Sequence, residues 1–239
     1  LDLLPDYKKT YNPKLEKYVE TFMTESRIST LKSTLKNRTK YLTLVAESLV
    51  DEHNIHAMIR SCECFGLQDF HNITDPNGHL KPSRSVSRGS FQWTHSYNYS
   101  ADTVPSLESI NHLKSRGYRV FASSSHLASN YTPQTIPIDQ PLAIIMGNEH
   151  NGISPIAMDQ CDGIISIPMY GFTESFNVSV AASLLLQPVI DRIRNSDLNW
   201  QLTEEEIKHI YYEWIWNGFS QPDNIYKEWS VKNSKSNSI

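Results

Sequence analysis

Apolar positions along the chain follow two spacings, short continuous runs and repeats of three and four residues. The continuous runs predict buried strands at 41–49, 67–73, 118–125, 142–147 and 163–167. The helical repeats predict helices at 13–25, 54–65, 105–116, 177–194 and 203–219, with a further short helix inside 27–40. Strands that alternate with helices are typical of an α/β fold, a parallel sheet with helices on both faces.

Three segments depart from these spacings. Residues 74–89 have no apolar period and are rich in Ser, Pro and Gly, which predicts a loop. Residues 90–100 alternate aromatic and polar side chains, as a half-exposed strand does. The last ten residues, SVKNSKSNSI, are polar, and we expect them to be disordered.

These patterns predict three regions. Residues 1–40 form an N-terminal helical extension, 41–194 the α/β domain, and 195–239 a C-terminal helical extension with a polar tail. The helix expected at 203–219 opens with a capping box, Thr203 to Glu206. Its Trp and Phe side chains are costly to expose, so the helix must pack either on its own domain or on a second copy of the chain.

Composition narrows the class of protein. The net charge of −4 argues against a protein that coats nucleic acid. No apolar run approaches the roughly 20 residues that span a bilayer, so we expect no membrane association. The three cysteines, Cys62, Cys64 and Cys161, have neither zinc-ligand spacing nor the even number of a disulfide framework. We therefore expect reduced thiols, no metal and a cytoplasmic location.

Positive charge is concentrated in residues 27–40, which hold five cations and no acid. Lys32, Lys36 and Lys40 are four residues apart, so one helix would align them on one face. Such a row is either a solvated helix face or a contact to a phosphate backbone, and its density in an acidic chain favours the phosphate contact. The candidate RNA-binding residues here are Arg27, Lys32, Lys36, Arg38 and Lys40.

Three segments carry candidate chemistry. In 164–186 a strand runs into Pro168, a polar loop follows, and Asn177 starts a helix of small apolar residues. In 142–154 a buried strand leads into a tight glycine-containing turn. In 53–67 Asn54 stands at a helix start, with Arg60 six residues later. A strand end, a loop and a helix N-terminus together can bind a small polar ligand.

Together the patterns N-x5-R, G-x-E-x-x-G and I-P-M-x-G-x-x-x-S-x-N-V-S-V-A resemble the three motifs of the SPOUT superfamily of RNA methyltransferases. Over about residues 27–219 the chain is most similar to the TrmH-type tRNA 2′-O-methyltransferases, which modify guanosine 18 of the D-loop. The resemblance implies S-adenosylmethionine as cofactor, a C-terminal trefoil knot that forms the donor pocket, and a homodimer.

The resemblance also implies particular site residues. Positions matching the donor contacts are Ser123, Met146, Gly147, Asn148, Ile167, Pro168, Met169 and Phe176. Apolar members of this set are alternatively ordinary core residues. Positions matching the catalytic centre are Arg60, Asn54, Glu149, Ser175 and Asn177. Asn177 also fits a simple N-cap, and the two roles are compatible.

Arg60 matches the catalytic arginine of the family. Because a guanidinium stays protonated in nearly all proteins, it is a poor general base. It either abstracts the proton with help from a substrate phosphate or binds a phosphate and stabilises the developing alkoxide. The alternative is a surface ion pair with Glu63 or Glu47. Arg84 and Arg88, in the loop at 74–89, are candidates to clamp RNA.

The expected function is S-adenosylmethionine-dependent 2′-O-methylation of ribose in structured RNA, foremost tRNA at guanosine 18. Ribosomal-RNA enzymes of this superfamily usually carry a separate N-terminal RNA-binding domain, whereas only about 50 residues precede Asn54 here. The alternatives are a ribosomal-RNA 2′-O-methyltransferase and a non-catalytic RNA-binding protein on the same scaffold. The lysine-containing basic tract and Glu174 depart from better-known members and bear on the identity of the RNA.

Overall fold

A computed structural model describes residues 6–74, 89–99 and 104–236. The chain divides into two units. One comprises Thr39–Gln201, and the other combines the segments before Thr39 and after Gln201. Among the described residues, no helix combines the length and apolar character that a bilayer crossing needs.

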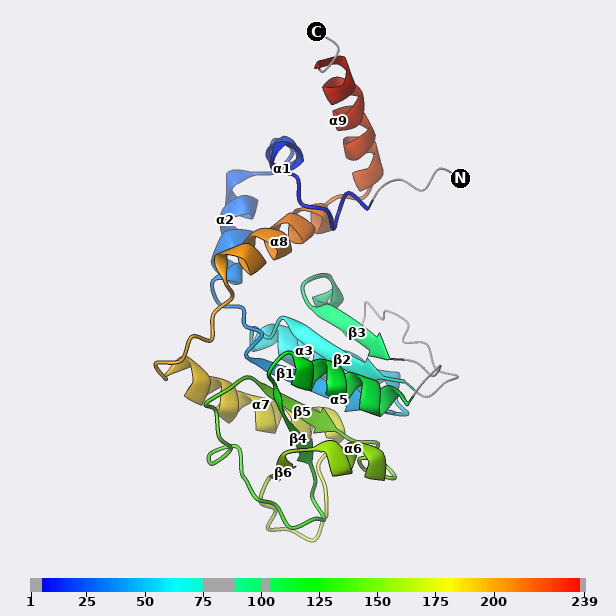
Figure 1. The fold of residues 1–239 in the computed structure, drawn as a ribbon, viewed down its shortest axis with the longest axis vertical. Coiled ribbons are helices and arrows are strands. Elements are labelled where there is room, and N and C mark those ends of the chain that lie inside the picture. The colour runs from blue at the N-terminus through cyan, green and yellow to red at the C-terminus, as the bar shows by residue number, and fades with distance from the viewer. Residues whose placement is uncertain (1–5, 75–88, 100–103, 237–239) are drawn as a thin grey trace. The chain divides into compact units, whose positions relative to one another are not determined.

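Six parallel strands form the centre of the unit Thr39–Gln201 (Figure 1). In chain order they are β1 (Leu42–Glu47), β2 (Asp69–Ile73), β3 (His95–Tyr99), β4 (Arg119–Ser123), β5 (Leu142–Met146) and β6 (Gly163–Ile165). Their order across the sheet is β3-β2-β1-β5-β4-β6. Every residue of β1 and β5 is buried, which explains why β5 is a continuous apolar run and why β1 is apolar except at Thr43 and Glu47.

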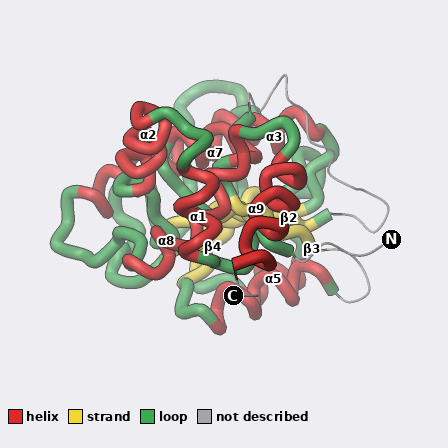
Figure 2. Tube along the Cα trace, turned by 90° about the horizontal axis from the view of Figure 1, so that it is seen from above, coloured by secondary structure: helices red, strands yellow, loops and turns green. Residues whose placement is uncertain are grey.

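Helices cover both faces of this sheet. They are α3 (Glu52–Cys64), α5 (Pro105–Ser115), α6 (Pro155–Gln160) and α7 (Val178–Arg194). Helices α3 and α7 pack in one apolar cluster with one face of the strands, and α5 and α6 contribute to a second cluster on the other face. Figure 2 shows α3 and α7 on one side of the strands and α5 on the other. β1 and β5 are neighbouring strands, but the segment after β1 leads to α3 on one face and the segment after β5 leads to α6 on the other. Two connections that diverge in this way open a crevice at the carboxyl ends of the strands.

The second unit is a helical assembly with an aromatic core. Its helices are α1 (Pro13–Glu20), α2 (Glu25–Leu35), α8 (Glu204–Ile215), the short 3-10 helix η2 (Trp216–Gly218) and α9 (Pro222–Ser236). The ring of Tyr7 lies 4.8 Å from that of Trp216 and is stacked 4.3 Å from that of Tyr226. The predicted capping box at the start of α8 is present. The aromatic residues of α8 are thus buried in their own unit.

Several sequence predictions need correction. The helix expected at 13–25 ends earlier, at Glu20, and the further helix expected inside 27–40 begins at Glu25, because Thr24 caps its N-terminus and accepts a hydrogen bond from Arg27 N at 3.2 Å. Residues 230–236 belong to α9 instead of being disordered. The predicted strand at 90–100 begins only at His95, after a 3-10 turn η1 (Ser90–Gln92). Helix α6 was not predicted. Most of the loop expected at 74–89 lies outside the described residues.

A buried polar cluster lies where β2 and β3 meet α5. His71 of β2 is fully buried, its Nδ1 lies 2.9 Å from the hydroxyl of Tyr99, and its ring is stacked on Tyr97 at 4.8 Å. Asp69, also buried, contacts Arg116 and His95 at 3.5 and 3.4 Å. Burial lowers the pKa of His71 to about 4, so the folded protein holds a neutral imidazole at physiological pH.

This pKa predicts an acid-sensitive fold. An unfolded histidine has a pKa of 6.5, so between pH 6.5 and pH 4 the unfolded chain binds a proton that folded His71 does not. The contribution of His71 to stability is therefore complete above pH 6.5 and declines as pH falls, by about 2 kcal/mol between pH 7.5 and pH 5. Urea titrations at both pH values test this. His71→Phe keeps the ring stack and should lose this component; an equal pH response in both proteins would contradict the assignment.

Candidate active site

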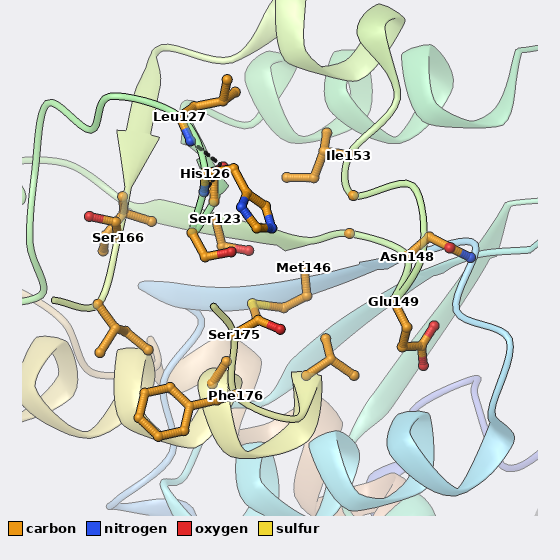
Figure 3. Close-up of a pocket in the computed structure, with 18 of the residues that line it drawn as sticks. Ser123, His126, Leu127, Met146, Asn148, Glu149, Ile153, Ser166, Ser175 and Phe176 are labelled. Carbon is orange, nitrogen blue, oxygen red and sulfur yellow. Dashed lines mark hydrogen bonds between the residues drawn. The ribbon is translucent and has the colours of Figure 1, made fainter. Parts of the chain in front are cut away.

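A pocket of about 610 Å³ opens at the carboxyl ends of β4, β5 and β6 (Figure 3). Three chain segments line it: the loop after β4, the turn after β5, and the loop that leads from β6 into α7. Its volume falls in the range typical of small-molecule sites, and its position is the one that a parallel sheet with diverging connections predicts.

Nearly all the residues predicted to contact a donor line this pocket. They are Ser123, Met146, Gly147, Asn148, Ile167, Met169 and Phe176, whereas Pro168 is not among the lining residues. Of the predicted catalytic residues, Glu149, Ser175 and Asn177 line it as well. Segments as far apart in the sequence as β4 and α7 therefore meet around one cavity.

Part of the pocket wall was not predicted from the sequence. The loop after β4 contributes Ser124, Ser125, His126 and Leu127, and its conformation is set by Ser124, whose Oγ accepts hydrogen bonds from the backbone N of His126 and Leu127 at 3.2 and 3.1 Å. The imidazole of His126 points into the cavity (Figure 3). The run of three serines at the end of a predicted strand was the available signal for this wall.

The turn after β5 depends on two glycines. Asn148 and Gly152 exchange backbone hydrogen bonds, each 2.9 Å long, and Gly152 has φ of +67°, a conformation that favours glycine. Asn148 Oδ1 accepts from His150 N and Asn151 N at 2.9 and 3.1 Å. A Cβ atom on Gly147 would lie 2.5 Å from the backbone N of Ile153 and 2.7 Å from the carbonyl O of Gly152. The folded turn thus leaves no room for a side chain at Gly147.

A chain of hydrogen bonds joins the three motif segments. Asn177 Nδ2 donates to Asn54 Oδ1 at 3.1 Å, and Asn54 Nδ2 donates to Glu149 Oε1 at 2.9 Å. The other carboxylate oxygen of Glu149 accepts from Val50 N at 3.2 Å. Asn177 Oδ1 meanwhile accepts from Ser179 N at 2.9 Å, so Asn177 caps α7 as well as joining the chain.

These contacts set the charge of Glu149. Partial burial raises the pKa of a carboxyl group, but the hydrogen bonds from Asn54 and from the backbone of residues near Val50 outweigh it and hold the pKa of Glu149 below its ordinary value. A carboxylate therefore stands at the edge of the pocket at neutral pH.

Arg60 lies on α3, exposed and outside the pocket lining. Its guanidinium makes no hydrogen bond or ion pair with any described residue. The alternative of a surface ion pair with Glu47 is wrong, because Glu47 is buried and accepts hydrogen bonds from Ser154 instead. An arginine that is not engaged by the protein is available to a phosphate.

The predicted RNA-binding cations do not form one row. Helix α2 ends at Leu35, so Lys36 follows the helix and Lys40 lies in the other unit. Lys32 is exposed but ion-paired with Glu20 at 3.5 Å. Arg38 is only 1% exposed and covers the ring of Trp214 at 5.4 Å.

The expectation that Arg38 contacts phosphate is therefore wrong, because its guanidinium is buried and packs on Trp214 inside the helical unit. Arg27 is partly exposed and Lys36 is exposed, so both can still be reached from solvent. Arg84 and Arg88 lie outside the described residues. In the part of the chain that the structure describes, no cluster of three or more His, Cys, Asp or Glu could hold a metal ion.

The amino-acid sequence of this chain is similar to those of several tRNA methyltransferases. The tRNA (guanosine(18)-2′-O)-methyltransferase of Borreliella burgdorferi is 33% identical over 85% of this chain and 92% of its own length. The enzyme of that name from Thermus thermophilus is 32% identical over 68% of this chain and 81% of its own. The Escherichia coli K12 enzyme of that name is 29% identical over 80% and 82%, respectively.

Solved structures agree with these relatives. The A. aeolicus TrmH/SpoU tRNA modifying enzyme superposes with a TM-score of 0.73 at 26% identity, over 81% of this chain and 97% of that one. The SpoU methyltransferase AviRb of Streptomyces viridochromogenes in complex with AdoMet has a TM-score of 0.56 at 19% identity, over 69% and 62%, which shows a shared fold. The model of the SpoU rRNA Methylase family matches residues 41–187. The chain belongs to the SpoU rRNA Methylase family.

Proposed function

We propose that this protein transfers a methyl group from S-adenosylmethionine to a ribose 2′-hydroxyl in RNA, and that its substrate is tRNA at guanosine 18. The observation that carries the proposal is the hydrogen-bond chain Asn177–Asn54–Glu149 beside the pocket, since it joins the three motif segments into one site. The relatives from Borreliella burgdorferi and Escherichia coli, which align with this chain over most of their own length, are named for that reaction on tRNA.

The pocket fits S-adenosylmethionine. Ile167, Met169 and Phe176 offer apolar walls for an adenine ring, and the glycine-dependent turn at Gly147 lets backbone groups approach a ligand closely. Serine hydroxyls and the Glu149 carboxylate supply polar groups for the ribose and the amino-acid part. When bound, the cofactor supplies a methyl group activated by its positive sulfur.

The protein must then orient the RNA and assist loss of the hydroxyl proton. Arg60, unengaged by other described residues, binds a substrate phosphate and stabilises the negative charge that develops on the 2′-oxygen. Ser175 and Asn177, at the N-terminus of α7, lie where a ribose can meet the pocket. We place Arg27, Lys36, Arg84 and Arg88 on the path of the RNA backbone, and the protein with its substrate in the cytoplasm.

Mapping of 2′-O-methyl groups tests the assignment of the substrate. Purified protein is incubated with methyl-labelled S-adenosylmethionine and with total RNA, tRNA or ribosomal RNA in parallel. We expect label at guanosine 18 of tRNA. Label confined to ribosomal RNA would show that the substrate is ribosomal RNA instead of tRNA. If the protein binds RNA measurably but labels none of the RNAs, it is a non-catalytic RNA-binding protein.

We also propose a homodimer formed through α7. Val180 and Leu184 are one helical turn apart and 46% and 41% exposed, while the opposite side of the helix, with Leu185 and Leu186, is buried. Phe172, just before α7, is fully exposed. Exposed apolar side chains at this density are typical of an interface. Because the aromatic residues of α8 are buried in their own unit, α8 is no longer part of the proposed interface.

Arg60→Ala should reduce methyl transfer at least about 100-fold, the scale of losing one group that stabilises developing charge. Affinity for S-adenosylmethionine should change less than about twofold, because Arg60 is outside the pocket lining. Calorimetric titration and single-turnover assays measure the two quantities separately. Arg116→Ala, which removes a cation bound to buried Asp69, serves as the control. Retention of most activity in Arg60→Ala would refute a role for Arg60 in the transfer step.

Gly147→Ala should abolish cofactor binding, because the added Cβ would lie 2.5 Å from Ile153 N and force the turn to move. The matched control is Gly171→Ala, where a Cβ would meet no atom closer than 4.0 Å. Calorimetry with S-adenosylmethionine compares the two proteins, and circular dichroism checks that both are folded. Wild-type affinity in a folded Gly147→Ala protein would remove this turn from the cofactor site.

Light scattering at micromolar concentration should give twice the 27.4 kDa of one chain. Replacing both Val180 and Leu184 by Asp should yield monomers, since charged groups would be buried in the interface. The control replaces Val231 of α9, 54% exposed, by Asp and should remain dimeric. A mass near one chain for the wild-type protein would refute the dimer.

A further inference from the structure

The short connection between β1 and α3 holds the turn that follows β5. Ser48 O accepts from Asn148 Nδ2 at 2.5 Å, and Val50 N donates to Glu149 at 3.2 Å. The third contact is made by Glu47, which accepts from Ser154 N at 2.9 Å and from Ser154 Oγ at 2.7 Å. We call residues 147–154 the donor loop.

Glu47 is a buried carboxyl group that the proposed reaction does not use. It is the last residue of β1, is 2% exposed, and also accepts a hydrogen bond from Ser106 Oγ of α5. A buried carboxyl group is costly unless its oxygens are hydrogen-bonded, so these contacts fix its position between the two elements. It does not line the pocket.

Glu47 is connected to the pocket through Ser154, because the residue before Ser154 in the chain lines the pocket. Ser154 directly follows Ile153, which lines the pocket. The backbone N of Ile153, together with the carbonyl group of Gly152, occupies the space that a side chain at Gly147 would need. Ser154 Oγ also accepts from Ala157 N at 3.2 Å and caps α6. Anchoring Ser154 therefore fixes the pocket wall on one side and α6 on the other.

We propose that Glu47 is a positioning residue that holds the donor loop in the shape that binds S-adenosylmethionine. The inference rests on the proposed cofactor site, and it gives Glu47 a role in affinity for the cofactor and none in the transfer step itself. Its contact to Ser154 is the one that matters, while its contact to Ser106 keeps the carboxylate in place.

Glu47→Gln tests this role with almost no change of volume. A glutamine amide is neutral and presents an NH2 group in place of one carboxylate oxygen, so the hydrogen bonds from Ser154 and Ser106 lose their charged acceptor and at least one of them must reverse its direction or break. We expect the Kd and the KM for S-adenosylmethionine to rise about tenfold, the effect of losing one charge-assisted hydrogen bond. The kcat at saturating cofactor and the KM for RNA should stay within about twofold of the wild-type values.

The matched control is Asp69→Asn, which alters another fully buried carboxyl group of the same sheet at the start of β2. It should lower the melting temperature without changing cofactor affinity. Hydrogen exchange should accelerate at the amides of Asn148, Gly152 and Ser154 in Glu47→Gln, and not in Asp69→Asn. Ser154→Ala provides a second, partly exposed site, and its effect on Kd should be less than additive with that of Glu47→Gln.

The possible outcomes distinguish a failure of the proposed cofactor site from a failure of the proposed role of Glu47. A wild-type protein that does not bind S-adenosylmethionine would refute the proposed cofactor site. Wild-type binding together with an unchanged Kd in folded Glu47→Gln and in folded Ser154→Ala would overturn the role of Glu47 alone. If Glu47→Gln does not fold, an unchanged Kd and unchanged loop exchange in Ser154→Ala would also overturn it.

Discussion

The close approach of Gly147 to the backbone of Gly152 and Ile153 is the constraint on which the site depends. The turn returns so tightly on β5 that no Cβ fits at Gly147, and Gly152 adopts a left-handed conformation to close it. Because β5 is buried in the middle of the sheet, the turn starts from a rigid position. Glu149 follows at once and is therefore held at the edge of the pocket.

The surrounding elements meet this turn from three directions. Asn54 and Val50 reach Glu149 from the start of α3, Asn177 reaches Asn54 from the start of α7, and Glu47 reaches Ser154 from the end of β1. Two helix N-termini and two strand ends thus depend on a few side-chain hydrogen bonds. This arrangement connects the helix that carries Arg60 with the wall of the pocket, although Arg60 itself lies outside the lining.

The two units use aromatic and charged residues differently. In the helical unit, Arg38 and the aromatic side chains of α8 are buried, so residues that suggest RNA or partner contacts stabilise the unit itself. In the α/β unit, Val180 and Leu184 remain exposed on a helix whose other side is core. The exposed apolar surface that supports the proposed dimer therefore lies on α7 and in the loop before it.

The sequence by itself determined the strands and most helices of the α/β unit, because a parallel sheet covered on both faces requires continuous apolar runs such as Leu142–Met146. It also determined the three motif segments, since Gly147, Asn177 and Arg60 stand in a joint pattern that few other folds need. It did not place the boundary between α1 and α2, because the apolar spacing of 13–25 continues past the end of α1 at Glu20.

Only the tertiary structure decided which polar residues are used internally. Charge spacing placed Lys32, Lys36 and Lys40 on one helix face, but the helix ends at Leu35. Arg38, another cation of the same tract, is buried against Trp214. The sequence likewise gave no sign that Glu47 reaches Ser154, more than a hundred residues away, since only the pairing of β1 with β5 brings them together. Local patterns specify elements, whereas contacts between distant residues depend on the strand order that assembles them.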